Sequence, residues 1–269
     1  MIGYACGCLA HPGRRRLLAG AVAAIALPVV SRAQTPADPG LLDDLVAANR
    51  ILYDQGVVDG FGHVSARHDK DPGRYLLSRS MAPALVGADD IMEYDLDSNP
   101  VDARGRTSYL ERFIHGEIYK LRPDVKAIVH SHSPAVLPFA GTDVKLMPMN
   151  HVAGFLGSGP PVFEIRETAG ENSDMLIRNA ALGHALAQVV GGNQVALMRG
   201  HGSVAVAQSV RHVVFRAVYT EVNARTEIQA MALGKPIFLN EKEAAAAMKT
   251  NDSLVDRPWA LWKQKAMRS

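Results

Sequence analysis

Cysteine is nearly absent from this chain of 269 residues, and its two cysteines, Cys6 and Cys8, both lie close to the start. No disulfide framework and no thiolate chemistry are therefore expected in the body of the protein. A strong excess of charge is also lacking, since 29 basic residues stand against 27 acidic ones. Nucleic-acid binding thus has no electrostatic support, and a metal ion would have to rely on nitrogen and oxygen ligands.

A hydrophobic run of membrane-spanning length is lacking too. The apolar stretch Leu17–Val30 covers roughly 14 residues and is interrupted by Pro28, whereas a spanning helix needs about 20. It follows Arg14-Arg15-Arg16 and precedes Ser31-Arg32-Ala33, which is typical of a cleavage site. Residues 1–33 are therefore predicted to be an export signal resembling the twin-arginine type, which serves proteins exported already folded.

Cleavage of this signal would change the charge balance of the protein. It would remove four arginines and no acid, leaving 25 basic and 27 acidic residues, a formal net charge of −2. We expect a transient contact with the twin-arginine export machinery and a periplasmic or otherwise exported mature chain. Anchoring to the inner membrane by an uncleaved signal, or a cytoplasmic location, are the alternatives.

The remainder of the chain has the composition of one globular domain, with 48% hydrophobic and 21% charged residues overall. Residues 34–40 are predicted to be a linker and residues 41–269 the domain. Apolar spacing predicts helices over 41–56, 110–121, 173–190 and 209–234, and strands over 61–67, 74–78, 126–129, 194–198 and 203–207. The segment after Leu239 is expected to be helical and then irregular. This alternation predicts an α/β protein, a single three-layer α/β/α domain with a mainly antiparallel central sheet.

Three histidines and a glutamate form the most informative pattern. His130 and His132 stand at the end of the apolar run 127–129, and residues two apart on a strand point to the same face. Such a pair can bind one metal ion and needs a third ligand. His201 is the predicted third ligand, because the glycine on each side of it lets its side chain approach from a second element. Glu111 is predicted to be a nearby carboxylate.

In this combination and order, the residues resemble the class II aldolase/adducin family. The resemblance runs from about residue 41 to residue 239 and is densest in Glu111–Tyr119, Arg122–His132 and Met198–Gly202. It implies that Glu111 is the catalytic acid/base and that one divalent metal ion per subunit is held by His130, His132 and His201. Histidine nitrogen suits Zn, Mn, Co, Ni or Fe, so the metal stays open. The resemblance also implies a homotetramer with sites near the subunit contacts.

The sequence departs from the sugar-phosphate aldolases of that family where those enzymes cradle the substrate phosphate. Their Gly-Asn-x-Ser, Thr-Pro-Ser-Gly and Ser-Ser segments are replaced by Gly62–Ser65, Ser78–Met81 and Tyr109-Leu110. A guanidinium such as that of Arg79 can bind a carboxylate through two parallel hydrogen bonds, which suits a carboxylated small-molecule substrate. The resemblance is therefore to the decarboxylase branch, whose members act on 2-hydroxy-3-carboxymuconate semialdehyde or dihydroxyphthalates. The predicted substrate-binding residues are His63, Ser65, Ser78, Arg79 and Ser80.

We therefore expect a divalent-metal-dependent carbon–carbon lyase that decarboxylates a hydroxy- or keto-carboxylated product of aromatic degradation. Loss of CO2 beside a carbonyl leaves an enolate, whose charge a metal stabilises as a Lewis acid. Glu111 would return a proton to carbon, which requires a raised pKa of its carboxyl. The alternatives are a class II aldolase, which cleaves a sugar phosphate or related hydroxy-carbonyl compound to a similar enolate, and a non-catalytic adducin-like binding protein.

Overall fold

The computed structural model describes residues 36–268 together with Gly3 and Gly7. Apart from those two glycines, the predicted export signal lies outside the described residues. The predicted linker 34–40 overlaps the first helix, which already begins at Pro39. Asp38 caps that helix, because its side chain accepts a hydrogen bond of 2.7 Å from the Gly40 N–H. Among the helices of the described part, none is long and apolar enough to cross a membrane.

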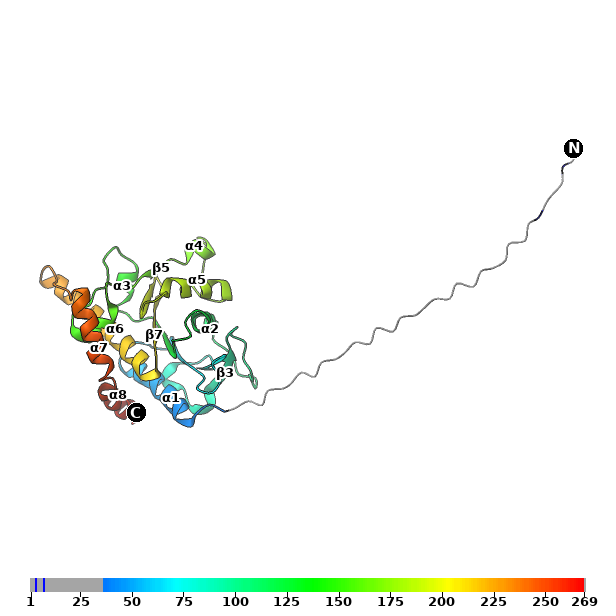
Figure 1. Ribbon diagram of the computed structural model, residues 1–269, viewed down its shortest axis with the longest axis horizontal. Coiled ribbons are helices and arrows are strands. Elements are labelled where there is room, and N and C mark those ends of the chain that lie inside the picture. Colours follow the sequence, from blue (N-terminus) through cyan, green and yellow to red (C-terminus); the bar gives the residue numbers. More distant parts are fainter. Residues whose placement is uncertain (1–2, 4–6, 8–35, 269) are drawn as a thin grey trace. The chain divides into compact units, whose positions relative to one another are not determined.

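A seven-stranded sheet forms the middle layer of the fold (Figure 1). Its strand order is β3-β2-β1-β4-β7-β6-β5, and neighbouring strands run antiparallel except for β5 and β6. The strands are β1 (His63–Arg67), β2 (Arg74–Ser78), β3 (Ile91–Asp95), β4 (Ala127–Ser131), β5 (Val162–Phe163), β6 (Val195–Met198) and β7 (Gly202–Ala207).

Helices cover both faces of this sheet (Figure 1). The α-helices are α1 (Pro39–Asp54), α2 (Arg112–Leu121), α3 (Leu137–Ala140), α4 (Arg166–Ala169), α5 (Ala180–Val190), α6 (Val210–Leu233), α7 (Glu241–Asp252) and α8 (Asp256–Ala266). Short 3-10 helices span Pro83–Leu85, Ala88–Asp90 and His151–Leu156. The predicted fold, a single α/β domain with a mainly antiparallel sheet between helices, is confirmed.

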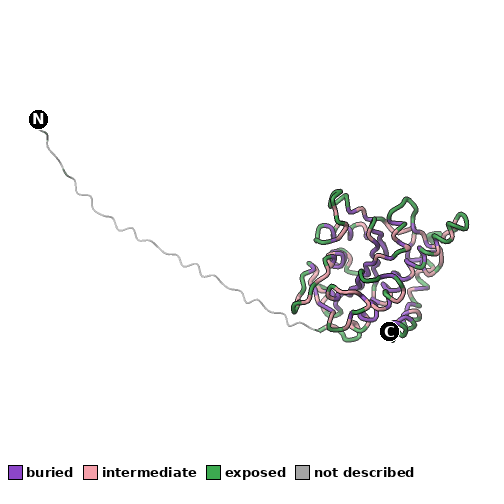
Figure 2. Tube along the Cα trace, turned by 180° about the vertical axis from the view of Figure 1, so that it is seen from behind, coloured by how far each residue is buried: buried purple, intermediate pink, exposed green. Residues whose placement is uncertain are grey.

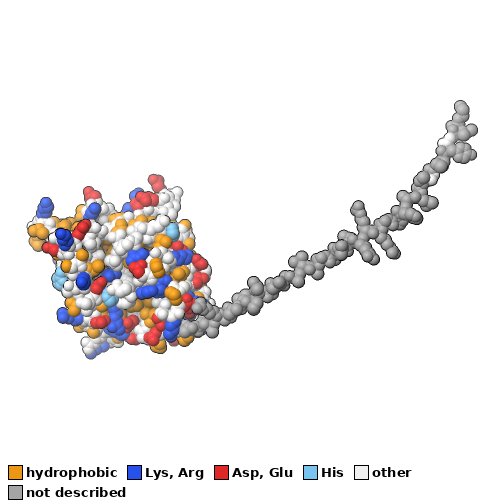
Figure 3. Space-filling view, in the orientation of Figure 1, with side chains coloured by type: hydrophobic (Ala, Val, Ile, Leu, Met, Phe, Trp, Pro, Cys, Tyr) orange, Lys and Arg blue, Asp and Glu red, His pale blue; other side chains and the backbone are white. Residues whose placement is uncertain are grey.

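Alternation along the strands divides the buried side chains between two core layers. On β4, Val129 belongs to the layer that includes α1, α6 and α8, whereas Ile128 belongs to the layer with α2 and α5. His130 is two residues beyond Ile128 and therefore points toward the α2 layer. In Figure 2 the buried segments run through the middle of the trace. Figure 3 shows acidic and basic side chains interspersed over one face of the molecule.

Two parts of the element prediction were wrong. The helix predicted from Ser173 begins only at Ala180, where the Asn179 side chain accepts a hydrogen bond from the Leu182 N–H. Before it, Met175 has a positive φ of 72°, which an α-helix does not allow. The C-terminal segment forms α7 and α8 instead of becoming irregular after one helix.

Helix α6 anchors the segment 147–149 through buried polar side chains. The Asn223 side chain accepts from the Met149 N–H (2.8 Å) and donates to the Met147 carbonyl (2.8 Å), and one Glu227 oxygen accepts from the Met147 N–H (2.9 Å). The other oxygen of Glu227, Oε1, is buried without a hydrogen-bond partner in the described chain. Burial raises the pKa of the Glu227 carboxyl to about 7, although the bond from Met147 opposes the rise.

We expect Glu227→Gln to stabilise the protein at pH 8 and to change little at pH 4. From pH 4.5, the usual pKa of the group, to about 7, the folded state binds more protons than the unfolded state, so the free energy of unfolding of the wild type falls as pH rises. Glutamine keeps an acceptor for Met147 and carries no charge. The gain at pH 8 should be about 1–2 kcal/mol. Urea unfolding at the two pH values measures it, and an equal gain at both would contradict the explanation.

Candidate metal centre

His130 and His132 meet at the end of β4. Their Nε2 atoms lie 3.2 Å apart, as expected for two side chains that leave one strand on the same face. The His130 Nδ1 lies 3.1 Å from the carbonyl oxygen of Ser203 on the neighbouring strand β7. Donation of the Nδ1 proton to that carbonyl leaves the Nε2 lone pair of His130 directed at the cluster. A backbone partner of this kind orients many metal-binding histidines.

His201 approaches from the turn between β6 and β7. Gly200 in this turn has a positive φ of 63°, a conformation that glycine adopts without a steric penalty. The ring centroid of His201 lies 4.9 Å from those of His130 and His132. Both ring nitrogens of His201 are buried and have no hydrogen-bond partner in the described chain. Unpaired buried nitrogens are costly, so they point to a ligand at this position.

Glu111 completes the cluster from the residue immediately before α2. Its Oε2 lies 3.5 Å from the His130 Nε2 and 3.4 Å from the His201 Nε2, while its Oε1 accepts a hydrogen bond of 2.9 Å from the Ile177 N–H. The helix predicted over 110–121 begins only at Arg112, so Glu111 precedes it and does not share a helix face with His115. His115 instead contacts His63 and Ser65.

The four side chains fit a divalent metal ion. One ligand atom from each of Glu111, His130, His132 and His201 lies within 4.8 Å of the others. Burial, together with the nearby His130, lowers the pKa of His132 to about 4, so its imidazole is neutral at pH 7 and has a lone pair to donate. Three imidazoles and a carboxylate are a donor set that several divalent transition metals accept. The geometry does not choose among them.

A buried hydrogen-bond chain lies behind the cluster and includes two of the predicted substrate-binding residues. The His63 Nδ1 lies 2.7 Å from the His115 Nε2, the His115 Nδ1 lies 2.6 Å from the Ser65 Oγ, and that oxygen lies 2.8 Å from the Tyr119 hydroxyl. Burial lowers the pKa of His63 and brings that of His115 to about 3. The chain therefore consists of neutral groups that hold the His63 ring beside His130.

A cavity of about 360 Å³ opens beside the cluster. Of the predicted substrate-binding residues, His63 and Ser80 line it and the other three do not. Ser65 is buried behind His63, the Ser78 hydroxyl lies 3.3 Å from that of Tyr109, and the Arg79 Nε is paired with the Asp90 carboxylate at 2.6 Å.

Most of the cavity-lining residues that were not predicted from the sequence are apolar. The other lining residues include Phe61, Tyr109, Leu110 and Leu176. Phe61 and Leu110 expose 69% and 58% of their surface, so large apolar side chains reach the solvent beside the polar cluster. Tyr109 and Leu110 were marked in the sequence only as replacements of a serine pair. Nothing in the local pattern shows that Phe61 and Leu176 meet, because they are distant in the chain.

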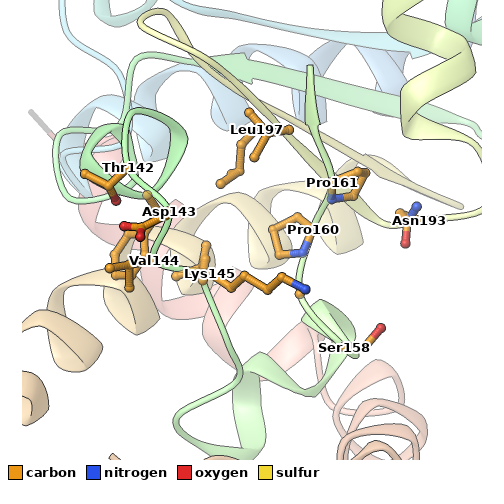
Figure 4. Close-up of a pocket in the computed structure, with 13 residues that line it drawn as sticks. Thr142, Asp143, Val144, Lys145, Ser158, Pro160, Pro161, Asn193 and Leu197 are labelled. Atoms are coloured by element: carbon orange, nitrogen blue, oxygen red, sulfur yellow. The ribbon is translucent and has the colours of Figure 1, made fainter. Parts of the chain in front are cut away.

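A second cavity, of about 480 Å³, lies elsewhere in the fold. Figure 4 shows it between the segment around Lys145 and the segment around Pro160, with Asn193 and Leu197 nearby. It shares no lining residue with the metal cluster and brings no group of metal ligands together among the described residues. We therefore place no chemistry there.

We expect Gly202→Ala to destabilise the protein by about 2 kcal/mol or more and to lower its metal affinity. A Cβ at Gly202 would lie 2.1 Å from the Ser131 carbonyl oxygen, a backbone atom that cannot move without parting β4 from β7. That separation would displace His201 from His130. Urea unfolding and metal analysis measure the two effects. Gly192→Ala is the control, since a Cβ there meets no atom within 4 Å; similar losses in both variants would refute the steric cause.

A comparison with known families agrees with this geometry. The model described as "Class II Aldolase and Adducin N-terminal domain" matches residues 43–228, which include all four residues of the cluster. The chain belongs to the class II aldolase/adducin family.

Curated relatives within the class II aldolase/adducin family include decarboxylases. Decarboxylase tropJ of Talaromyces stipitatus is 36% identical over 240 residues, covering 81% of this chain and 90% of that protein. The 3,4-dihydroxyphthalate decarboxylase of Arthrobacter keyseri is 29% identical over 210 residues, covering 72% of this chain and 80% of that protein. The predicted family, and within it a metal-dependent lyase, are confirmed by the relatives together with the His/Glu cluster.

Solved structures show the same fold at low identity. The L-fuculose 1-phosphate aldolase from Glaciozyma antarctica PI12 superposes with a TM-score of 0.70 at 20% identity, covering 87% of this chain and 94% of that one. At this identity the likeness establishes the shared fold and leaves the substrate open.

Proposed function

We propose that this protein is a divalent-metal-dependent decarboxylase of small hydroxy- or keto-carboxylates of the kind formed in aromatic degradation. The observation that carries the proposal is that Glu111 and His132, two members of the Glu111/His130/His132/His201 cluster, line a mainly apolar cavity. Such a cavity accommodates a planar carbon skeleton, while the cluster binds its oxygens. The names of the relatives from Talaromyces stipitatus and Arthrobacter keyseri support the reaction class.

The three histidines would hold the metal ion, and Glu111 is placed to move a proton. When bound, a divalent ion acts as a Lewis acid that stabilises negative charge on a substrate oxygen. His130 is oriented for this task by the Ser203 carbonyl, and His201 by the turn at Gly200. The side chains of Phe61 and Leu110 supply the apolar part of the cavity lining.

Glu111 starts the reaction as an anion. Burial opposes its ionisation, but the neighbouring imidazoles of His130 and His201 outweigh burial and lower the pKa of its carboxyl. The raised pKa expected from sequence is therefore not a property of the resting site. Glu111 instead takes the proton from a substrate hydroxyl and delivers it to the carbon that carries the leaving carboxylate. As the bond to CO2 breaks, its electron pair returns to the substrate oxygen, which later takes a proton from water.

The test is CO2 release by the metal-reconstituted full chain. The substrates are a panel of ortho-dihydroxy aromatic acids and 2-hydroxy-3-carboxymuconate semialdehyde, with His132→Ala as the inactive control. We expect stoichiometric CO2 from at least one acid with the wild type and none above background with the variant. No CO2 from any acid, together with cleavage of a sugar phosphate, would replace the proposal with an aldolase activity.

A further inference from the structure

His132 lies just beyond the end of the sheet. Strand β4 ends at Ser131, which is its last residue paired with β7, so the backbone of His132 is outside the ladder. His130 is within the ladder, and its ring is oriented by the Ser203 carbonyl oxygen, 3.1 Å from Nδ1. Among the described residues, the His132 ring contacts the cluster and Phe61 and has no backbone acceptor of this kind. The segment that follows His132 therefore contributes to where this ring lies.

Glu221 on α6 holds that segment in place. Its Oε2 accepts a hydrogen bond from the Ser133 hydroxyl (2.5 Å) and another from the Ala135 N–H (3.0 Å). These residues stand one and three positions after His132, and the Glu221 and Ser133 side chains are both buried. Hydrogen bonds to a carboxylate are charge-assisted and stronger than those to a neutral acceptor. Two of them on one oxygen fix the backbone immediately after His132 relative to α6.

The second oxygen of Glu221 faces outward. Its Oε1 lies 2.7 Å from the Nη2 of Arg225, one turn further along α6, and the Arg225 side chain is 61% exposed. The carboxylate thus joins the loop beside the cluster to an ion pair at the surface. Burial of even a paired charge can cost more free energy than the pair returns, so a carboxylate here acts through the loop that it places and adds little to stability.

We propose that Glu221 is a positioning residue of the metal centre. Through Ser133 and Ala135 it sets the position of the His132 ring, and through that ring it sets the affinity of the cluster for a divalent ion. The inference rests on the metal centre of the proposed function and adds a residue outside the four members of the cluster. Glu221 itself touches neither the ion nor the substrate in this role.

The test is the binding of Co²⁺, used alone as the probe because its visible absorption also reports the coordination geometry. The Kd is measured on the metal-free full chain by competition with a chelator of known affinity. We expect Glu221→Ala to weaken Co²⁺ binding at least about tenfold, the lower end of the loss typical for groups that orient metal ligands, and to change the absorption spectrum. Glu221→Gln should stay within about threefold of the wild type, because its carbonyl oxygen can accept both hydrogen bonds.

Asn223→Ala is the matched control on the same helix. Asn223 is as deeply buried as Glu221 and holds Met147 and Met149, which neither belong to the cluster nor line its cavity. This variant should lower the free energy of unfolding in urea and leave the Kd and the spectrum of Co²⁺ unchanged. Equal losses of Co²⁺ affinity in Asn223→Ala and Glu221→Ala would show that any damage to α6 weakens the site, which would overturn the inference.

Ser133→Ala removes one of the two hydrogen bonds without altering α6, so it keeps the inference testable if Glu221→Ala does not fold. We expect about threefold weaker Co²⁺ binding or more, as the loss of a single hydrogen bond implies. Combined with Glu221→Ala it should add little, because both changes remove the same contact. Wild-type affinity in Ser133→Ala and in any folded Glu221→Ala would contradict the positioning role.

CO2 release, recorded separately, distinguishes this inference from the proposed function. If Co²⁺ binding weakens in the expected order and the wild type releases no CO2 from any acid, the positioning role stands and the decarboxylase activity fails. If the wild type releases CO2 and Glu221→Ala binds Co²⁺ as tightly as the wild type, the activity stands and the positioning role is refuted. Failure of the wild type to bind Co²⁺ would overturn the positioning role together with the metal centre.

Discussion

Glu111→Gln should lower the turnover number at least about a hundredfold while the protein keeps its fold and its metal ion. Glutamine has nearly the same shape, and its carbonyl oxygen can still accept the hydrogen bond from the Ile177 N–H, so the segment before α5 stays in place. The three histidines remain as ligands. What disappears is the anionic group that accepts and returns a proton. Steady-state CO2 release and metal analysis measure the two halves of this prediction.

Glu117, a carboxylate on α2, provides the matched control for Glu111→Gln. Glu117 is also largely buried, with its carboxylate 2.7 Å from the Lys120 ammonium, but it is not a member of the cluster. Glu117→Gln should therefore keep turnover within about threefold of the wild type, since it touches no substrate-facing group. Full turnover by Glu111→Gln would remove Glu111 from the mechanism. Equal losses in both variants would mean that the effect comes from the helix and not from the site.

Short-range patterns predict much of the metal centre. The period of two along β4 places His130 and His132 together, and the glycines around His201 indicate a tight turn. Both features depend on backbone geometry within a few residues, which is why they are visible in sequence. The order of Glu111 before the histidines adds the family resemblance, and the family match confirms it.

Features that depend on long-range contacts could not be predicted. Arg79 looks free in sequence, yet it is paired with Asp90 from a short helix before β3. Ser65 follows His63 on the same face of β1, but only the fold shows that the cavity ends at His63 and leaves Ser65 in the core. The export signal, the location and the homotetramer stay predictions.

The apolar wall of the cavity could not be predicted for the same reason, because it also depends on long-range contacts. Phe61 and Leu176 are more than a hundred residues apart in the chain and lie on the same cavity because the turns before β1 and before α5 both reach the end of β4. Composition alone marks such residues as candidates for the core. Their position at a polar cluster is a property of the folded chain, which composition does not reveal.

His201→Ala should abolish stoichiometric metal binding and reduce CO2 release at least about a thousandfold. Loss of a group that merely orients a ligand already costs about 10–100-fold in metal affinity or activity, so loss of the ligand itself should cost more. His184→Ala is the control, because His184 is half-exposed on α5 and does not belong to the cluster. Metal analysis after dialysis and CO2 release measure the effect.

The melting temperature gives a second test of His201→Ala, because the direction of its change with a chelator can be predicted. Metal binding stabilises the folded state by mass action, so a chelator should lower the Tm of the wild type and leave that of His201→Ala unchanged. Without metal, the two proteins should melt at similar temperatures. The alanine removes two buried ring nitrogens that have no partner in the described chain, and this relief offsets the cavity that the substitution creates. If the metal-free variant were much less stable than the metal-free wild type, His201 would be a structural residue first, and the unpaired nitrogens would no longer indicate a metal site.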